Sequence, residues 1–397
     1  MKSYRTENEY GAGEVISWAS IIDENTVEQA QRTSRSSVID GHVALMPDAH
    51  LGIGATVGSV LVTADAIIPA AVGVDIGCGM IAVRTDVERG VLDQAACHRI
   101  LGRIRESVPS GFGKGNAEVQ PEARQFVAKQ GWAPGVDGQP ELQQRALAQF
   151  CSLGDGNHFA EVAEDRDGVV WAIVHSGSRG VGNVLANHHI RIAQDFCAAN
   201  AFRLEDSALA FLSVGTDEFD AYIADMQWAQ EYAFWQRDAM MTRVLAAVAE
   251  EVTFSELERI NCHHNYSVEV DGGKWLTRKG AIAAEAGIRG IIPGSMGDAT
   301  YIVTGRGNEK AYHSSPHGAG RVLSRGAARR GLDVDEFRSH MTGKVWQDRD
   351  ADDLIDEAPA AYKPIETVME DAASLVESTA ILSQFINMKG IGKRRKK

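Results

Sequence analysis

The stretch NCHHNY at residues 261–266 contains a cysteine and two adjacent histidines in a segment with the alternation of a β-strand. Side chains of a strand point to its two faces in turn, so Cys262, His264 and Tyr266 share one face and His263 points to the other. The two histidines are therefore expected to have different roles. The stretch predicts a strand that brings His264 to a functional site.

Metal-binding residue types recur in glycine-rich turns along the rest of the chain. They stand in the motifs GVDIGCG (73–79), GNHF (156–159) and HSGSRG (175–180). With the stretch above, these motifs offer imidazoles, one carboxylate and one thiolate, a mixed set that suits divalent transition metals better than Mg²⁺ or Ca²⁺. The set could hold one ion, or two if the sulfur bridges. The candidate ligands are Asp75, Cys78, His158, His175 and His264.

The interpretation of Asp75 and Cys78 as ligands depends on the histidines. On their own, a turn-forming aspartate and a small buried cysteine would explain this motif equally well. The histidines strengthen the metal interpretation because each is expected at a junction between a strand and a loop, where active-site loops tend to lie.

The pattern of apolar residues predicts a mixed α/β fold. Runs rich in β-branched residues predict short strands, and apolar residues near helical spacing predict long helices that cover the sheets. No repeat or linker divides the sequence, so we expect one catalytic domain over residues 1–390, with its site built from distant loops, and a basic tail over residues 391–397. The predicted strands are 56–63, 80–84, 169–174, 266–270 and 300–304, and the predicted long helices are about 218–250 and about 366–388.

A further histidine, His317, precedes the segment GAGRVLSRGAARR at residues 318–330. This segment predicts a helix, which would place His317 beside a helix N-terminus. Free amide groups and the helix dipole attract anions at such a position, so a phosphate would fit well there.

Other polar motifs carry a weaker signal. Asp48 and His50, in MPDAHLG (46–52), are as consistent with structural support for the metal loop as with direct catalysis. The segment GFGKG at residues 111–115 lacks the spacing of a phosphate-binding loop and is expected to be a flexible loop. Surface positions are expected for three histidines without a comparable context, His188, His189 and His313.

The charge balance limits how the protein can bind nucleic acid. Its 54 acidic residues exceed its 40 Lys and Arg residues, which gives a formal net charge of −14. Phosphate contacts require local Lys or Arg, so an RNA partner is expected in a local basic cleft and not on a generally basic surface. One candidate is the end of the chain, residues 393–397, for which a solvated, disordered end is the alternative. The other candidate is the group Arg321, Arg325, Arg329 and Arg330.

The composition also bears on the cellular location. Five cysteines occur without a CxxC pair, and the first residues contain no apolar run that resembles a signal peptide. No apolar stretch approaches the ~20 residues of a membrane span. We therefore expect a cytoplasmic protein with reduced thiols and no membrane partner.

Taken together and in order, eight motifs resemble those of the RtcB family of RNA ligases. The resemblance runs from about residue 40 to Lys389 and so covers nearly the whole chain. It implies the family's own α/β fold and a GTP-dependent reaction with two Mn²⁺ ions, which joins an RNA 3′-phosphate or 2′,3′-cyclic phosphate end to a 5′-hydroxyl end. The motifs are MPDAHLG, GVDIGCGM, GNHFAEV, HSGSRG, NCHHNY, TRKGA, IIPGSMG and HGAGR.

The resemblance also implies a role for each motif. Cys78 would bridge two Mn²⁺ ions held by the five candidate ligands, and His317 would be the nucleophile that becomes guanylylated. Arg179, Lys279 and Arg321 would contact RNA or its phosphates. An activating protein partner is possible, and we expect a monomer. The pocket for GTP or GMP would be formed by Asn157, His158, Phe159, Ala160, Glu161, His264, Asn265, Pro293, Gly294, Ser295, Met296, Thr300, His317, Gly318, Ala319, Gly320 and Lys389.

Two other functions use part of the same residues. A dinuclear phosphoesterase that hydrolyses cyclic phosphate ends would need the metal ligands, but neither His317 nor a guanine pocket. A metal-dependent RNA-binding or accessory subunit would need neither turnover nor GTP. The motifs HGAGR and GSMG favour the ligase over both.

Overall fold

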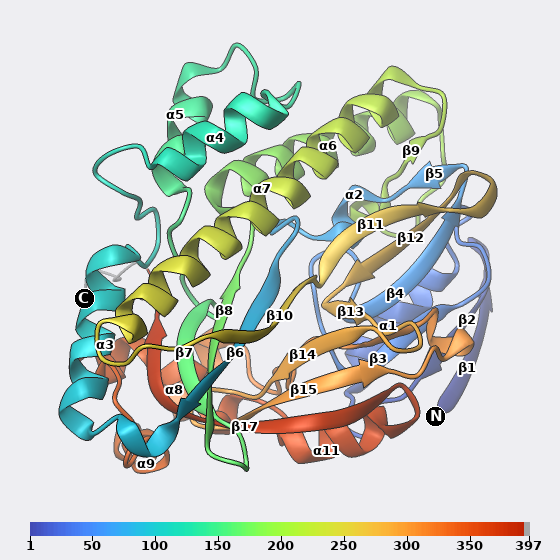
Figure 1. Cartoon of the computed structure of the whole chain (residues 1–397). Coiled ribbons are helices and arrows are strands. Elements are labelled where there is room, and N and C mark those ends of the chain that lie inside the picture. The colour runs from blue at the N-terminus through green and yellow to red at the C-terminus, as the bar shows by residue number, and fades with distance from the viewer. Residues whose placement is uncertain (393–397) are drawn as a thin grey trace.

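The computed structural model of the chain describes residues 1–392. Within these residues the fold consists of two large β-sheets, two short strand pairs and eleven α-helices (Figure 1). The mixed α/β class predicted from the sequence is confirmed.

The two large sheets contain six and seven strands. In spatial order, the six-stranded sheet comprises β1 (Lys2–Asn8), β2 (Gly11–Ser17), β3 (Val43–His50), β4 (Val57–Ala64), β12 (Lys274–Lys279) and β11 (Asn265–Val270). The seven-stranded sheet comprises β10 (Glu256–His263), β6 (Gly79–Glu88), β8 (Val169–Ser176), β7 (Phe159–Glu164), β17 (Val376–Lys389), β15 (Ala299–Gly305) and β14 (Arg289–Pro293). The short pairs are β13 (Ala281–Ala283) with β16 (Ser314–Pro316), and β5 (Ala66–Ile67) with β9 (Leu212–Ser213).

Long helices cover one face of the seven-stranded sheet. Helix α7 (Asp217–Ala249) lies across β6, β8 and β10, and α6 (Arg179–Ala199) packs beside it (Figure 1). The remaining helices are α1 (Glu24–Ser34), α2 (Pro69–Val72), α3 (Gln94–Ser107), α4 (Pro121–Gln130), α5 (Pro140–Gln149), α8 (Arg325–Gly331), α9 (Val334–His340), α10 (Ala351–Leu354) and α11 (Ile365–Asp371).

The seven-stranded sheet curls until its two edge strands approach each other. Ile260 of β10 and Ile291 of β14 belong to one buried apolar cluster, although their strands lie at opposite edges of the sheet. Arg289 of β14 also forms an ion pair with Glu258 of β10, at 2.8 Å. The curled sheet thus encloses its own core on one face and leaves the other face to α7.

The stretch NCHHNY lies where the chain passes from one large sheet to the other. It begins at the end of β10, which finishes at His263, and continues as β11 from Asn265. His264 stands at the break, where its main-chain N–H donates to the carbonyl of Cys78 at 2.7 Å. The single strand expected here is therefore two strands, and the break aims His264 at the turn that carries Cys78.

The helix predicted for residues 218–250 is confirmed as α7. Thr216 caps its first turn by accepting from the N–H of Phe219, and Asp217, Glu218 and Asp220 stand in the same turn. Acidic side chains at a helix N-terminus are stabilised by the helix dipole. The five strands predicted from β-branched runs are confirmed within one or two residues as β4, β6, β8, β11 and β15, except that β6 extends four residues further at its C-terminal end.

The helix predicted for residues 366–388 is wrong beyond its first turns. Helix α11 ends at Asp371, and Val376–Lys389 form the long strand β17. The strand lies between β7 and β15 inside the curled sheet, and its residues 384–389 are all buried. A strand buried on both faces loses the period of two, so its apolar run resembles a helix.

The helix predicted for residues 318–330 is also wrong in its start. Helix α8 begins only at Arg325, because Gly320 takes a φ of +73° and the chain next to it pairs with residues 361–363. A positive φ is incompatible with a right-handed helix. His317 therefore lies in a loop and not beside a helix N-terminus.

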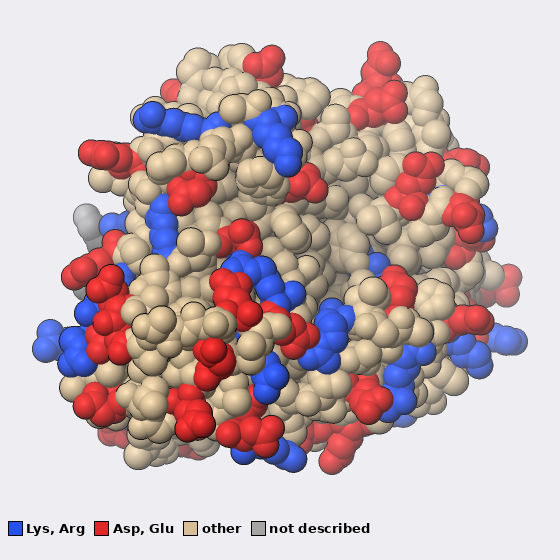
Figure 2. Space-filling model, viewed as in Figure 1, with Lys and Arg blue, Asp and Glu red and all other residues tan. Residues whose placement is uncertain are grey.

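Charges on the surface are mixed. On the face seen in Figure 2, Lys and Arg are interspersed with Asp and Glu and form no continuous basic stripe. Two of the four arginines proposed as a basic group are neutralised: Arg321 pairs with Glu357 and Arg329 with Asp356. The other candidate, residues 393–397, lies outside the described residues. Within residues 1–392, no helix combines the length and apolarity needed to cross a lipid bilayer.

Candidate active site

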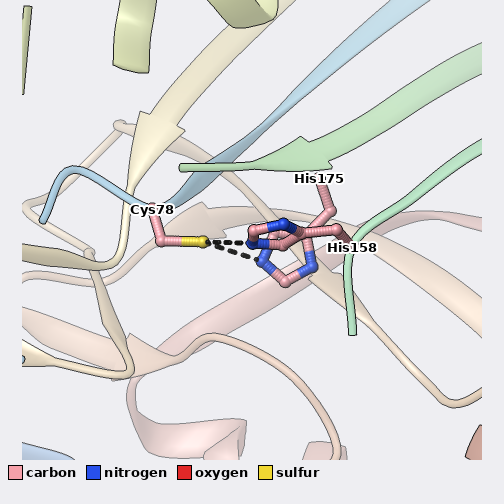
Figure 3. Close-up of side chains that lie close together, drawn as sticks. All are labelled: Cys78, His158 and His175. Atoms are coloured by element: carbon pink, nitrogen blue, oxygen red, sulfur yellow. Dashed lines mark hydrogen bonds between the residues drawn. The ribbon is translucent and has the colours of Figure 1, made fainter. Parts of the chain in front are cut away.

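The five candidate metal ligands converge from distant segments. The centre of the group comes from the neighbouring strands β6, β7 and β8, which bring Cys78, His158 and His175 together (Figure 3). Sγ of Cys78 lies 3.2 Å from Nε2 of His158 and 3.4 Å from Nε2 of His175. Oδ2 of Asp75 lies 3.0 Å from Nε2 of His158, and Nε2 of His264 lies 2.9 Å from Nε2 of His175.

These contacts form a chain of donor atoms with the sulfur in its middle. One half contains Asp75, His158 and Cys78, and the other contains Cys78, His175 and His264. Each half offers three donors from the set that divalent transition metals prefer, and both halves share the thiolate. The chemistry of this donor set fits divalent transition metals, and the shared thiolate is compatible with either one ion or two.

Burial sets the protonation of the group in the absence of ions. It lowers the pKa of His175 and His264 well below the ordinary value, so both rings are neutral and can bind a metal. Burial, together with the nearby carboxylate of Asp75, raises the pKa of the Cys78 thiol well above its ordinary value. Burial alone would raise the pKa of Asp75, but the hydrogen bond with His158 keeps it below its ordinary value. Metal binding must therefore displace the proton from Cys78.

The turns around these ligands require glycine. A Cβ on Gly177 would lie 2.2 Å from Oδ1 of Asp75, and a Cβ on Gly154 would lie 2.0 Å from Nδ1 of His158. Real Cβ atoms do not approach other atoms so closely, so a side chain at either position would displace a ligand. The glycine-rich turns noted in the sequence thus serve close packing around the donors.

The same turns are held by a buried arginine that the sequence analysis did not single out. Arg237 of α7 donates to the carbonyl of Gly77 at 2.7 Å and to that of Ser176 at 2.9 Å. These carbonyls adjoin Cys78 and His175. Burial lowers the pKa of Arg237 to about 10. The signal was present in the sequence, because a charged residue on the apolar face of a long helix is rarely buried without a role.

His263, on the other face of the stretch, also holds one of these turns. Its Nδ1 lies 2.9 Å from the carbonyl of Gly77 and 3.2 Å from the guanidinium of Arg237. The adjacent histidines therefore differ as expected: His264 points to the metal donors and His263 supports the turn behind them.

His317 lies against the end of the donor chain. Its ring centroid is 4.5 Å from that of His264, and its Nδ1 is 2.6 Å from Oδ2 of Asp48. The main-chain N–H of His317 donates to the same oxygen at 3.1 Å. Asp48 is fully buried and contacts His317, and neither of the two roles left open by the sequence, support of the metal loop or direct catalysis, included this contact.

A cavity of about 330 Å³ opens beside His317. Its lining includes Asp75, Cys78, His175 and His264, so the donor chain and His317 face the same space. Of the residues proposed for the guanylate pocket, those that line the cavity are Asn157, Phe159, His264, Asn265, Pro293, Gly294, Ser295, His317, Gly318, Ala319, Gly320 and Lys389. Those that do not line it are His158, Ala160, Glu161, Met296 and Thr300.

Glu161 stands behind this cavity wall in a buried hydrogen-bond network. Its Oε1 accepts from the hydroxyl of Thr300 at 2.9 Å, and its Oε2 accepts from the amide of Asn387 at 3.4 Å. Burial raises the pKa of Glu161 to about 7. The network exists because β17 pairs with β7, which places Asn387 opposite Glu161 and Lys389 opposite Phe159.

Lys389 is held in the cavity wall by a second carboxylate. Its Nζ donates to Oε2 of Glu357 at 2.8 Å, and Oε1 of Glu357 accepts from Arg321 at 3.3 Å. Burial alone would raise the pKa of Glu357, but Lys389, Arg325 and Arg321 lower it to about 2. Glu357 is thus a buried anion between cations, and the sequence reading did not single it out.

A second, larger cavity of about 1050 Å³ adjoins the first. Val74, Asp75, Asn157 and Arg325 line both cavities, so the two spaces meet at the donor chain. The second cavity continues along α5, α6 and the segment 112–116.

The three predicted RNA contacts occupy different positions. Arg179 lines the larger cavity, takes a φ of +58° and donates to the hydroxyl of Ser152 at 3.2 Å. Lys279 lines the smaller cavity, where its Nζ donates to the carbonyls of Ile53 and Ala70 and burial lowers its pKa to about 7. Arg321 also faces the smaller cavity, although Glu357 already engages it. Their contacts with RNA remain predictions.

One of the three histidines expected at the surface is buried. His189 of α6 is 2% exposed, and its Nε2 lies 2.7 Å from Oδ2 of Asp225 in α7. The prediction of a surface position is wrong for His189 because α7 covers this face of α6, a long-range contact that the local sequence does not reveal. His188 is exposed and His313 is half-buried.

Comparison with known proteins identifies the family. A sequence model described as "tRNA-splicing ligase RtcB" matches residues 29–390. The RNA-splicing ligase RtcB of Escherichia coli strain K12 is 39% identical over 391 residues, which cover 93% of this chain and 95% of the relative. The tRNA-splicing ligase RtcB of Thermococcus kodakarensis is 28% identical over 442 residues, which cover 93% of this chain and 90% of the relative. This chain therefore belongs to the RtcB family of tRNA-splicing ligases.

Proposed function

We propose that this protein is an RNA ligase that joins an RNA 3′-phosphate or 2′,3′-cyclic phosphate end to a 5′-hydroxyl end, with GTP as co-substrate and two Mn²⁺ ions as cofactors. The observation that carries the proposal is His317, which lies against His264 of the donor chain while Asp48 holds its Nδ1. Membership of the family supports the ligase class. The choice of GTP and Mn²⁺ follows the family resemblance.

The nucleophile would be Nε2 of His317. The buried carboxylate of Asp48 can only accept a hydrogen bond, so Nδ1 of a neutral ring carries the proton and Nε2 keeps its lone pair. Nε2 would attack the α-phosphate of GTP, forming an N–P bond while the bond to the β-phosphate breaks and pyrophosphate leaves.

Two transfers would complete the reaction. The RNA 3′-phosphate would attack the phosphorus held on His317, which restores the imidazole and leaves an RNA-(3′)pp(5′)G end. The 5′-hydroxyl of the second RNA would then attack the 3′-phosphate, and GMP would leave as the phosphodiester forms. A 2′,3′-cyclic phosphate would first be hydrolysed to a 3′-phosphate.

The cavity offers groups for each part of the substrates. Asp75, Cys78, His158, His175 and His264 would hold the ions, whose charge would neutralise the reacting phosphates. Lys389 would read a guanine edge from the wall formed by β7 and β17, and Glu161, which stands behind that wall, would support it electrostatically. The larger cavity, with Arg145, Arg179 and Arg325 in its lining, would receive the RNA end beside Asp75.

Incubation with α-labelled GTP and Mn²⁺, followed by denaturing electrophoresis, tests the proposal. The wild type should become covalently labelled, and His317→Ala should lose both labelling and ligation while its metal content is unchanged, because His317 is not a proposed ligand. His188→Ala, at an exposed position, serves as the matched control and should label normally. Equal labelling of His317→Ala would show that another residue is the nucleophile.

The same assay tests the guanine pocket. ATP presents a different hydrogen-bonding edge to Lys389 in the cavity wall, so α-labelled ATP should label the protein poorly. Comparable labelling by both nucleotides would contradict this pocket. Hydrolysis of cyclic phosphate ends without labelling or joining would instead indicate a phosphoesterase.

A further inference from the structure

A buried lysine lies behind His317 without a role in the chemistry described above. Lys363 stands between the short 3₁₀ turn Pro359–Ala361 and helix α11, and it is 3% exposed. Burial lowers the pKa of its ammonium group, while the carboxylate of Asp48 acts in the opposite direction. Burying an ammonium group is costly, so its position requires compensating contacts.

The contacts of Lys363 join the end of strand β3, which carries Asp48, to the loop that carries His317. Its Nζ donates to the carbonyl of Pro47 at 2.9 Å and to the carbonyl of Ala49 at 2.8 Å, on either side of Asp48. Its main-chain N–H donates to the carbonyl of Gly320 at 2.9 Å, three residues after His317. One residue therefore fixes the end of strand β3, which carries Asp48, and the loop that carries His317.

The end of β3 and the loop that follows His317 are closely packed against each other. A Cβ on Gly320 would lie 2.2 Å from the main-chain oxygen of Asp48. Oδ2 of Asp48 receives both the Nδ1 and the main-chain N–H of His317. A shift of the end of β3 would therefore misalign both hydrogen bonds at once, and hydrogen bonds weaken steeply with misalignment.

Lys363 also supplies positive charge near a carboxylate that needs it. Asp48 is 0% exposed, and its Oδ1 has no hydrogen-bond partner among residues 1–392. A buried carboxylate is stabilised by nearby positive charge. The ammonium of Lys363, bound to the carbonyls on either side of Asp48, is placed to provide it.

We propose that Lys363 is a positioning residue for the nucleophile: its clamp on residues 47–49 of β3 holds Asp48 against Nδ1 of His317 and so keeps Nε2 directed into the cavity. The inference rests on the proposed function only for the guanylylation step. The later joining of an already activated RNA-(3′)pp(5′)G end does not use His317, so it should not depend on Lys363.

The test separates these two steps in Lys363→Met, which keeps the length of the side chain and removes its donors. The single-turnover rate of His317 guanylylation at saturating GTP should fall roughly 100-fold, the scale expected for a nucleophile displaced by about 1 Å. Joining of a pre-guanylylated RNA to a 5′-hydroxyl end should change less than about threefold, and GTP affinity should be unchanged. Lys344→Met is the matched control, because Lys344 donates its Nζ to the carbonyl of His340 and lines neither cavity.

A second variant and a spectroscopic readout keep the outcomes distinct. Lys363→Gln retains an amide donor and should show an intermediate loss of guanylylation. In the wild type without nucleotide, ¹⁵N-histidine NMR should show a slowly exchanging Nδ1–H of His317, and this signal should broaden in Lys363→Met. Equal losses in guanylylation and joining, an unchanged guanylylation rate, or failure of both variants to fold would overturn the positioning role. Absence of guanylylation in the wild type would overturn the proposed function, and the NMR signal would still test the clamp.

Discussion

The two walls of the smaller cavity differ in how their polar groups are satisfied. On the metal wall, formed by Cys78, His175 and His264, donor atoms face one another: the Nε2 atoms of His175 and His264 are 2.9 Å apart, and Sγ of Cys78 lies 3.4 Å from Nε2 of His175. On the proposed nucleotide wall, formed by β7 and β17, Lys389 pairs with Glu357, and Glu161 behind it is hydrogen-bonded to Thr300 and Asn387. The donor atoms of the metal wall therefore crowd one another, whereas the polar groups of the nucleotide wall are satisfied by neighbouring side chains.

This difference predicts different consequences of substitution. Removal of a donor from the metal wall should act mainly on metal content, because Arg237 and His263 hold the surrounding turns independently of that donor. Changes in the nucleotide wall should act on protein stability as well as on nucleotide choice, because its groups hold one another.

The largest effect is expected at the sulfur shared by the two halves of the donor chain. Cys78→Ala should lower Mn²⁺ affinity by more than the roughly 10- to 100-fold typical for loss of a group that only supports a ligand. Cys262→Ala should retain metal, because Cys262 packs against apolar clusters behind the sheet. Metal content after gel filtration, measured for both variants, decides between them. A similar loss of manganese in both would mean that Cys78 is not the bridging ligand.

The candidate metal ligands could be predicted from the sequence more readily than the residues that support them. Cys78 and His175 could be predicted because soft and imidazole donors in glycine-rich turns are uncommon, and the residue types themselves carry the signal. These residues meet because β6, β8 and β7 are neighbours in the sheet, and no local sequence pattern predicts that order. The resemblance to the family supplied this arrangement in advance of the fold.

The supporting residues could not be predicted because their partners are distant in the chain. Lys363 contacts carbonyls more than 300 residues away, and Arg237 reaches turns that precede it by 61 and 160 residues. Strand β17 was misread for a related reason, since burial on both faces removed the alternation that identifies a strand. The periodicity of apolar residues identifies a helix or strand only where one face of that element meets solvent.

A smaller effect is expected at Glu161, on stability. Its pKa is raised from 4.5 to about 7 in the folded protein, so between these values the folded state binds more protons than the unfolded chain. Stability should therefore fall as pH rises from about 4.5 to about 7, and Glu161→Gln should remove this loss. The stability of the variant relative to the wild type should rise across that window by an amount on the order of 3 kcal/mol.

Urea unfolding of the metal-free and nucleotide-free proteins between pH 5 and pH 8 measures this difference. Glu164→Gln is the matched control, because Glu164 ends the same strand at a half-exposed position. Its stability relative to the wild type should be nearly independent of pH. A constant difference for Glu161→Gln over the same range would show that the buried carboxyl group does not titrate in this window.

The smallest effect is expected at the basic end of the chain, residues 393–397, which lie outside the described residues. A truncation to residues 1–392 keeps Lys389 in β17 and keeps the carbonyl of Ile391, which accepts from the N–H of Phe112 at 3.1 Å. Guanylylation of His317 should therefore survive. RNA affinity should also change little, because Arg179 and Arg325 stand in the cavity that would receive the reactive end.

Each phosphate contact with single-stranded RNA contributes about −0.7 to the slope of log affinity against log salt. RNA binding by the truncated and full chains should be titrated across salt concentrations, and a slope shallower by about one unit or more in the truncated chain would show that the tail holds RNA.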